Sequence, residues 1–224
     1  MKGSIGVNDM RAYPDTDLGG AAGLDLPPWE RRDRFGFLNG LYLTIKDVLL
    51  APHRFFARMP SAVGLGQPLL FALVIGVAGA FVSWMWALTG SSLQVLLQDN
   101  LQSAFKGPLY SFFAFLTSPV AVTLGVFLKA ALMHVMLLIM GGGKLGFEAT
   151  FRVAAYAEAA DILSIVPFCG SILVLGWTLV ILIVGLHAIH QDEPWKAVAA
   201  VVAPLVLCLS VAGTGLALIL MGLS

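Results

Sequence analysis

The stretch PLLFALVIGVAGAFVSWMWAL, residues 68–88, contains 21 residues without a charge. At about 1.5 Å per residue, a helix of this length crosses the roughly 30 Å hydrocarbon core of a bilayer. Trp84 and Trp86, near its end, belong to the residue types that gather at membrane interfaces. This stretch alone predicts an integral membrane protein.

The composition of the whole chain agrees with that prediction. Of its 224 residues, 58% are hydrophobic and only 12% are charged, against about a quarter charged in soluble proteins. The formal net charge is zero, but eight of the thirteen Lys and Arg residues lie in the first 58 positions. Such an asymmetry reports membrane orientation and does not indicate a nucleic-acid partner. Cys169 and Cys208 lack the spacing of a metal site and fall at different expected depths, so no disulfide is predicted.

The apolar pattern predicts an all-α fold, an integral membrane bundle of five transmembrane helices preceded by a cytoplasmic amphipathic interfacial helix. After residues 68–88, the further spans are expected at residues 119–140, 147–167, 171–189 and 197–221. The chain then divides into a flexible polar segment (1–34), interfacial amphipathic helices (35–66) and a five-span domain (67–224).

Residues 108–119, PLYSFFAFLTSP, leave one uncertainty about the second span. Joined to that span they would make a helix of 33 residues, about 50 Å long. A kink at Pro119 or a shallow re-entrant piece is therefore preferred.

Charge fixes the expected orientation. With the N-terminus in the cytoplasm, Lys144, Arg152 and Lys196 are cytoplasmic too, and eleven of thirteen basic residues lie inside. Lys106 is then outside, Lys129 is within the membrane, and the C-terminus faces out. Residues 1–34 lack the apolar core of a cleavable signal peptide, so the first span is expected to act as the membrane signal.

Residues 35–59 form an amphipathic pattern before the first span. The apolar stripe at helical spacing contains Phe37, Leu38, Leu41, Tyr42, Ile45, Val48 and Leu49. Such a helix suits the inner leaflet, ends at Pro52, and is followed by a short piece carrying Phe55 and Phe56. The alternative is that its apolar face packs on the protein's own spans.

Three arginines stand beside this stretch. Arg31, Arg32 and Arg34 could each add about 1 kcal/mol of attraction to anionic lipid. They are the predicted membrane-surface binding residues.

Two carboxylates, Glu158 and Asp161, lie inside the third expected span, where charge is costly and usually functional. The short loop GGGKLG, residues 141–146, joins the second and third spans as a helical hairpin, and counting from its midpoint places Lys129 level with Glu158. We therefore expect Lys129 to pair with Glu158 or Asp161, on a polar stripe facing the bundle interior. His134 is expected to border the same cluster.

Ala72, Gly76 and Ala80 form a small-xxx-small stripe on the first span. Such a stripe permits close helix contact within the bundle or between protomers.

The sequence HAIHQDE places two histidines one turn apart, with two acids following. The candidate metal constellation is His187, His190, Asp192 and Glu193. The alternative, that the histidines are hydrogen-bonding groups at the membrane interface, is preferred, and no metal is predicted. Signatures of enzymes such as HExxH, GxSxG or a P-loop are missing from the sequence, so no catalytic residues are predicted.

The chain resembles a bacterial member of the Ypt-interacting-protein (Yip) domain family over roughly residues 28–204. The resemblance rests on PWERRDRFGFLNGLYLTIKDVLLAPHRFFARMP, on GGGKLGFEATFRVAAYAEAADILSIVPFCG with the apolar segment after it, and on PWKAVAAVVAP. The similar positions are the turn 141–143, Phe151, Arg152, Val153, Tyr156, Ala157, Pro167, Gly170, Trp177, Gly185 and His190.

This resemblance implies five spans and a cytoplasmic N-terminus, and for a bacterial member a place in the cytoplasmic (inner) membrane. Eukaryotic members of the family form homo- and hetero-oligomers that contact Rab-type GTPases and membrane-curving partners. Some bacterial relatives carry a cysteine-paired zinc ribbon before the PWE segment, and this chain has no cysteine there.

Two classes of function fit these features. The first is a membrane-organising or adaptor protein, in which the polar cluster locks the bundle. The second is a proton- or cation-coupled permease that uses Lys129, Glu158 and Asp161. The first is preferred, because five spans without a discernible inverted repeat make a poor single-chain carrier. The expected partners are the lipid bilayer, anionic lipids included, and a second copy or another membrane protein, with no cofactor and no nucleic acid.

Overall fold

The computed structural model describes residues 25–98, 101–167 and 169–222, and every regular element in these ranges is a helix. The segment 1–24, which makes up most of the predicted flexible N-terminal region, lies outside the described residues, as do the side chains of Lys106 and Cys208.

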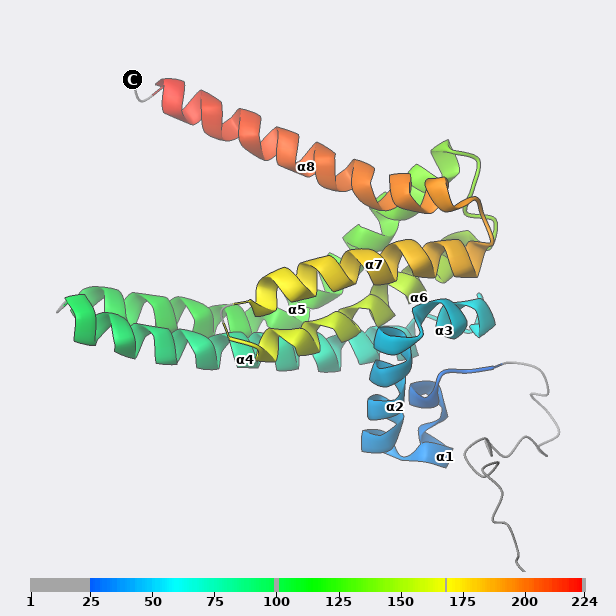
Figure 1. Ribbon diagram of the computed structural model, residues 1–224, viewed down its shortest axis with the longest axis horizontal. Helices are drawn as coiled ribbons and strands as arrows, with labels where there is room; N and C mark the ends of the chain where they lie inside the picture. The colour runs from blue at the N-terminus through cyan, green and yellow to red at the C-terminus, as the bar shows by residue number, and fades with distance from the viewer. Residues whose placement is uncertain (1–24, 99–100, 168, 223–224) are drawn as a thin grey trace, which may run out of the picture.

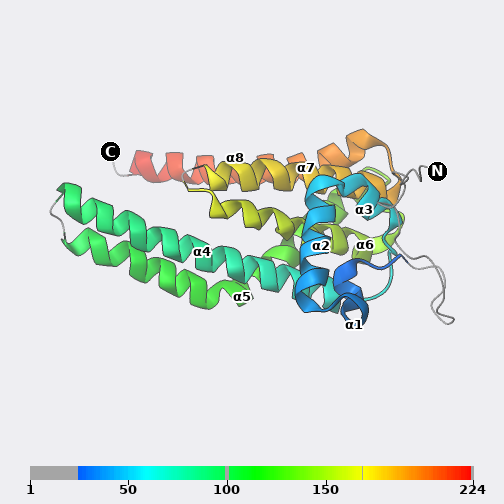
Figure 2. The same cartoon turned by 60° about the horizontal axis from the view of Figure 1, so that its bottom comes forward.

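Four short helices precede the long ones. They are η1 (Pro28–Arg31), α1 (Arg32–Phe35), α2 (Phe37–Leu50) and α3 (Pro52–Arg58), here called the N-terminal unit. Gly36, with φ of 75°, lets the chain turn between α1 and α2. As expected, α2 ends before Pro52, which starts α3 at the helix position that needs no N–H donor. In Figures 1 and 2, α2 runs across the long helices rather than along them.

Helices α4 (Gly66–Gln98) and α5 (Leu101–Ile139) form an antiparallel hairpin that extends well beyond the other helices (Figure 1). Helix α5 is continuous over 39 residues, so of the two alternatives predicted for residues 108–119 the re-entrant piece is wrong, and a kink at Pro119 stays a prediction. Pro119 removes the N–H that would bond to the carbonyl of Phe115, and the Ser118 hydroxyl donates to that carbonyl at 2.7 Å instead. This local replacement lets the helix pass through a proline.

The third predicted span, residues 147–167, is not one α-helix. It divides into α6 (Gly146–Tyr156) and a 3-10 helix, η2 (Ala157–Ile165). Side chains three residues apart are eclipsed in a 3-10 helix, so Glu158, Asp161 and Ser164 lie along one edge of η2. The α-helical spacing predicted for these residues is therefore wrong from Ala157 to Ile165.

Helices α7 (Gly170–His190) and α8 (Pro194–Gly222) complete the chain. In Figure 1 the C-terminal half of α8 diverges from the other helices. Three stretches are long and apolar enough to cross a membrane, Gly66–Thr89, Leu109–Ile139 and Gly170–His190, and Pro194–Leu207 is a shorter apolar helix. Five spanning helices, as predicted, are therefore not all present as long apolar α-helices in the described residues.

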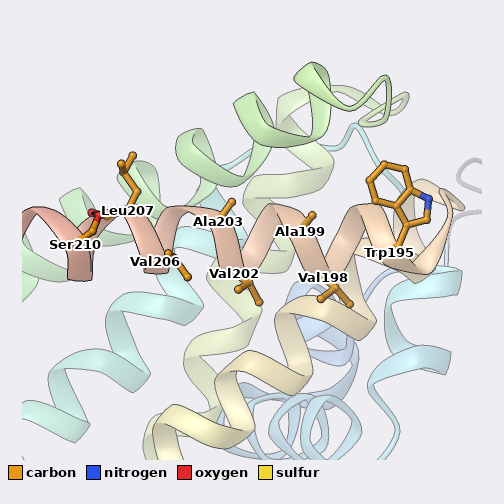
Figure 3. A pocket seen from close by; sticks show the side chains of 8 residues that line it. All are labelled: Trp195, Val198, Ala199, Val202, Ala203, Val206, Leu207 and Ser210. Carbon is orange, nitrogen blue, oxygen red and sulfur yellow. Dashed lines mark hydrogen bonds between the residues drawn. The ribbon is translucent and has the colours of Figure 1, made fainter.

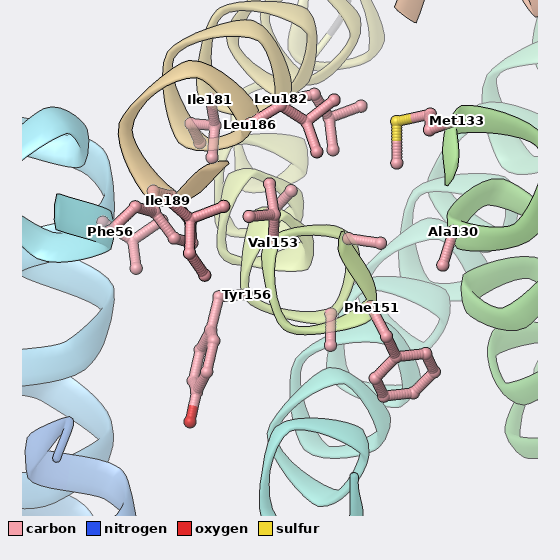
Figure 4. Packing of buried hydrophobic residues seen from close by; sticks show 14 of the residues in the cluster. Phe56, Ala130, Met133, Phe151, Val153, Tyr156, Ile181, Leu182, Leu186 and Ile189 are labelled. Atoms are coloured by element: carbon pink, nitrogen blue, oxygen red, sulfur yellow. The ribbon is translucent and has the colours of Figure 1, made fainter. Parts of the chain in front are cut away.

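Helix α6 lies at the centre of the core. All its residues from Ala149 to Tyr156 are buried, and Figure 4 shows Val153, Tyr156 and Phe151 of this helix pointing toward different neighbours. Gly185 of α7 makes room for Val153 and for Phe56 of α3, since an added Cβ would lie 2.7 Å from Val153 Cγ1 and 2.9 Å from Phe56 Cδ2. The N-terminal unit and the membrane helices therefore share one hydrophobic core.

Candidate functional site

The ammonium group of Lys129 on α5 donates a hydrogen bond to Glu158 Oε1 on η2. Their side chains are 28% and 15% exposed, so the ion pair is largely shielded. Asp161 lies beside Glu158 and reaches toward α4, where its Cβ would be 3.4 Å from a Cβ added at Gly79. The cluster expected from the hairpin thus joins three helices, α4, α5 and η2.

His134 belongs to a different network from the one predicted for it. Its Nδ1 lies 3.0 Å from the Thr150 hydroxyl, which is 2.9 Å from His190 Nε2. The backbone N–H of Leu145 donates to His190 Nδ1 at 3.4 Å. A neutral His190 therefore carries its proton on Nε2 and donates to Thr150, and the hydroxyl of Thr150 donates to His134. This chain connects α5, α6 and α7.

The turn between α5 and α6 is held from the end of α7. Asp192 Oδ2 accepts a 2.7 Å hydrogen bond from the N–H of Gly143, whose φ is 72°. A Cβ at Gly142 would lie 2.6 Å from the same oxygen, so the Asp192 carboxylate would have to shift to admit one. Lys144 adds a partly exposed ion pair to Asp192 at 3.7 Å.

The four residues of the candidate metal constellation do not converge. His187 Nδ1 donates to the carbonyl of Asp192 at 2.7 Å, His190 binds Thr150, and Glu193 accepts a hydrogen bond from the Trp195 indole. In the described part of the chain, no three His, Cys, Asp or Glu side chains are placed to hold a metal ion.

A buried charged cluster that the sequence analysis missed lies between η1 and α6. Arg152 is fully buried and donates to Glu30 Oε1, and the Tyr156 hydroxyl donates to the same oxygen at 2.5 Å. Arg152 also donates to the carbonyl of Gly64 at 3.2 Å. The charge of Arg152 predicts a position at the cytoplasmic end of the third span, and its partner Glu30 lies 122 residues earlier.

Around this cluster, the N-terminal unit is bound to the long helices by further polar contacts. The buried Trp29 donates through its indole to the carbonyl of Gln67 at 2.9 Å, and its backbone N–H donates to the Thr44 hydroxyl at 2.9 Å. Glu148 on α6 accepts the backbone N–H of Val63 at 2.5 Å. The loop before α4 is therefore fixed from both sides.

The three arginines predicted to bind the membrane surface lie in two different environments. Arg32 stacks over Trp29, 4.5 Å from the ring centroid, and donates to Gln67 Oε1 at 2.5 Å. Arg31 and Arg34 instead line a cavity of about 550 Å³, here called the arginine cavity. Its lining comes from residues 25–28, Arg31, Arg34, Phe35, Asp47, Ala51, Arg54, Phe55 and Arg58.

Asp47 on α2 is one of the two acids of the arginine cavity. Burial raises the pKa of its carboxyl above the ordinary value, and the charges of Lys46, Arg54 and Arg58 oppose that rise only in part.

The small-residue stripe on α4 is used within the chain. Ala72 and Gly76 are buried, and a Cβ at Gly76 would lie 2.6 Å from Val122 Cγ2 of α5. Ala80 is partly exposed. Gly76 therefore sets the close approach of α4 and α5.

Helix α8 presents an exposed apolar face. Figure 3 shows Val198, Val202 and Val206 on one side of it, and Trp195, Ala199, Ala203 and Leu207 on the other. Val198, Val202 and Val206 are among its exposed members. An uncovered apolar face of this kind suits contact with lipid.

The arrangement as a whole can hold helices together. Each of the polar clusters joins elements that are distant in the sequence: Lys129 with Glu158, Thr150 with two histidines, and Arg152 with Glu30. Among the described residues, the arginine cavity combines several charged side chains with a volume of about 550 Å³.

Comparison with protein-family models matches residues 46–215, more than half of the chain, to the Yip1 domain. Neither the curated proteins nor the solved structures contain a match. The matched region includes α4, α5, α6, η2 and α7 entire and most of α8. This all-helical membrane protein therefore belongs to the Yip1 domain family.

Proposed function

We propose that the protein organises its membrane as a non-catalytic scaffold or adaptor, with the N-terminal unit lying in the cytoplasmic leaflet. The observation that carries this proposal is the dual surface of α2. Gly40, Thr44 and Val48 pack inward, while Leu38 and Tyr42, one turn apart, are 77% and 60% exposed. Of the predicted apolar stripe, Val48 therefore serves the fold, whereas Leu38 and Tyr42 form an outer surface.

A rigid connection between this surface and the bundle supports the same role. Trp177 of α7 donates to the carbonyl of Leu49 on α2 at 3.2 Å, and Glu30 is bound to Arg152 and Tyr156 of α6. Insertion of α2 into one leaflet would therefore act on the whole bundle rather than on a hinged arm.

The proposed topology has five spans with the N-terminus in the cytoplasm of a bacterium and the C-terminus outside. The third span would be α6 together with η2, because 11 α-helical and nine 3-10 residues rise about 34 Å together, enough for the hydrocarbon core. The fifth would be α8, whose 29 residues extend about 44 Å.

Assembly with a second copy or another membrane protein is part of the proposal. Because α5 occupies the α4 stripe at Gly76, contact between protomers would use another surface. The exposed side chains of Val198, Val202 and Val206 on α8 are far from the N-terminal unit in the sequence. They could contact lipid or a partner helix.

Vesicle shape tests the proposal. The full chain is reconstituted into phosphatidylcholine and phosphatidylglycerol vesicles, and vesicle diameters are measured by electron cryomicroscopy. Leu38→Ala with Tyr42→Ala should abolish the reduction in diameter that the wild type causes, because apolar area for insertion is lost. The matched control is Asn39→Ala with Lys46→Ala, on the polar side of the same helix.

Thermal stability of both double variants should stay close to that of the wild type, since all four side chains are exposed. A wild type that leaves vesicle size unchanged at high protein density would contradict the proposal. The proposal would also be contradicted if the Leu38→Ala, Tyr42→Ala variant reduced vesicle diameter as much as the wild type does.

A second candidate function is a proton- or cation-coupled permease. The observation that favours it is the break between α6 and η2, which lies directly before Glu158 and close to Asp161. Interrupted helices with acids near the midplane are typical of transport sites. Proton uptake into vesicles that is present in the wild type and lost in Asp161→Asn would favour this function. Absence of uptake by the wild type would contradict the permease and favour the scaffold function.

A further inference from the structure

The arginine cavity has two basic walls. Arg31 and Arg34 of the segment around α1 form one side, and Arg54 and Arg58, one turn apart on α3, form the other. Phe35 lies among them, with the guanidinium carbons of Arg31 and Arg34 at 5.5 and 5.9 Å from its ring centroid. The cavity therefore brings four guanidinium groups from separate elements to one place.

Among the described residues of the lining, arginines outnumber acids. Asp25 and Asp47 are its two carboxylates, against four arginines. Asp25 is 3.7 Å from Arg31, a long ion pair, and its side chain is 54% exposed. Like charges held this close repel one another, and an anion in the cavity would relieve that repulsion.

The guanidinium group has the geometry that selects among anions. Its planar pair of N–H donors matches the oxygens of a phosphate group, and it keeps its charge at any physiological pH. A volume of about 550 Å³ is ample for a phosphate group with its attached alcohol. Phe35, Phe55 and Pro27 provide apolar wall for the carbon portion.

We propose that the arginine cavity is a binding site for a phosphate-bearing anion. The phosphate belongs either to a phospholipid headgroup or to a soluble phosphate compound, and the two sources present the same chemistry to the arginines. The site lies on the N-terminal unit, so only its lipid form rests on the proposed position of that unit in the leaflet.

The test uses the full chain in nanodiscs and two probes. The first probe is lipid, compared between nanodiscs of phosphatidylcholine alone and of equimolar phosphatidylcholine and phosphatidic acid, with retained lipid counted by native mass spectrometry. The second is inorganic phosphate added to phosphatidylcholine nanodiscs, with binding read from the shift in melting temperature.

Arg54→Gln with Arg58→Gln removes one basic wall through exposed residues of α3. Arg31→Gln with Arg34→Gln removes the other. Each should weaken binding of the effective probe about tenfold or more, because two charge-assisted hydrogen bonds are lost. The matched control, Lys46→Gln with Lys144→Gln, removes the same charge outside the cavity and should change binding less than about twofold.

Selective retention of phosphatidic acid, lost in both cavity variants and kept in the control, assigns the site to a headgroup. A phosphate-dependent shift in phosphatidylcholine nanodiscs, with the same variant pattern, assigns it to a soluble compound. Equal weakening in all three variants overturns the site, because binding would then follow total charge alone. No binding of either probe by the wild type overturns it too.

Arg54→Lys with Arg58→Lys provides a second measurement that keeps the charge. Binding should fall several-fold, since lysine lacks the planar fork of donors, and unchanged binding would contradict phosphate recognition by arginine. Vesicle deformation by the Arg54→Gln, Arg58→Gln variant should persist through Leu38 and Tyr42, so failure of the cavity and failure of the scaffold proposal are told apart.

Discussion

Replacing Glu30 with Gln should destabilise the protein severely, because it strands the guanidinium of Arg152. That side chain is 0% exposed, and it also donates a hydrogen bond to the carbonyl of Gly64. Breaking a buried pair from one side costs about 3 to 5 kcal/mol. The Tyr156 hydroxyl then donates to a neutral amide oxygen in place of a carboxylate, and this weaker hydrogen bond adds about 1 kcal/mol to the loss of stability.

The companion change, Arg152→Met, leaves a buried carboxylate that still accepts from Tyr156 and should cost somewhat less. The double variant should be more stable than the sum of the two losses predicts, by about 2 kcal/mol or more, because neither charge is then left alone. Unfolding of the purified protein in mixed micelles, followed by circular dichroism in increasing denaturant, gives all four free energies.

Arg54→Met is the matched control, since Arg54 is exposed and its loss should change stability by less than about 0.5 kcal/mol. Additive losses in the double variant, within about 0.5 kcal/mol, would refute a direct pair between Glu30 and Arg152. The reasoning also fails if Glu30→Gln is no more harmful than the control.

Three other outcomes are expected. Lys129→Glu should sharply lower stability in detergent, and the exchange of Lys129→Glu with Glu158→Lys should recover much of the loss, unless the two are not neighbours. Gly76→Ala should cost about 1 to 3 kcal/mol, because its Cβ would lie 2.6 Å from Val122 Cγ2, and adding Val122→Ala should restore most of it. Burial raises the pKa of Asp47, so its ionised form opposes folding, and the stability advantage of Asp47→Asn should grow as pH rises from the unfolded toward the folded pKa of Asp47.

Each of these has a result that counts against it. An exchanged protein no more stable than either single charge variant would exclude a direct pair. Gly125→Ala is the control for the glycine prediction, since a Cβ there meets nothing within 4 Å, and equal losses at both glycines would refute the close contact. A wild type whose stability rises with pH relative to Asp47→Asn would reverse the sign inferred for Asp47.

The contact between Lys129 and Glu158 could be predicted because it depends on local geometry. Two antiparallel helices joined by a six-residue loop have few possible registers, and equal counting from the turn matches residues at the same depth. The end of α2 at Pro52 was predictable for a similar reason, since proline acts on its own helix.

The pairing of Arg152 with Glu30 could not be found in this way. Helical periodicity relates residues within one element, whereas this contact closes a loop of 122 positions between two elements. Charge alone assigned Arg152 to the cytoplasmic side, and no local pattern marked it as buried. The resemblance to the Yip domain family includes Arg152 and Tyr156. It was the one signal in the sequence that pointed to these two positions.

The 3-10 winding of η2 could not be predicted either, because an alanine-rich sequence with two acids is compatible with both α and 3-10 helices. In α5, which continues through Pro119, the Ser118 hydroxyl donates to the carbonyl released by that proline. Rules for proline predict the broken bond and do not predict its replacement.

The 3-10 helix has a mechanical consequence. Its nine residues exceed the usual run of three or four, so neighbouring helices must hold it in this form, through Lys129 at Glu158, Gly79 beside Asp161 and Trp86 at the carbonyl of Ser164. Rewinding as an α-helix would shorten the segment by about 4.5 Å and rotate its far end by about half a turn. The contacts of Glu158 and Asp161 thus set the pitch of this segment, and with it the depth to which Ile165 extends.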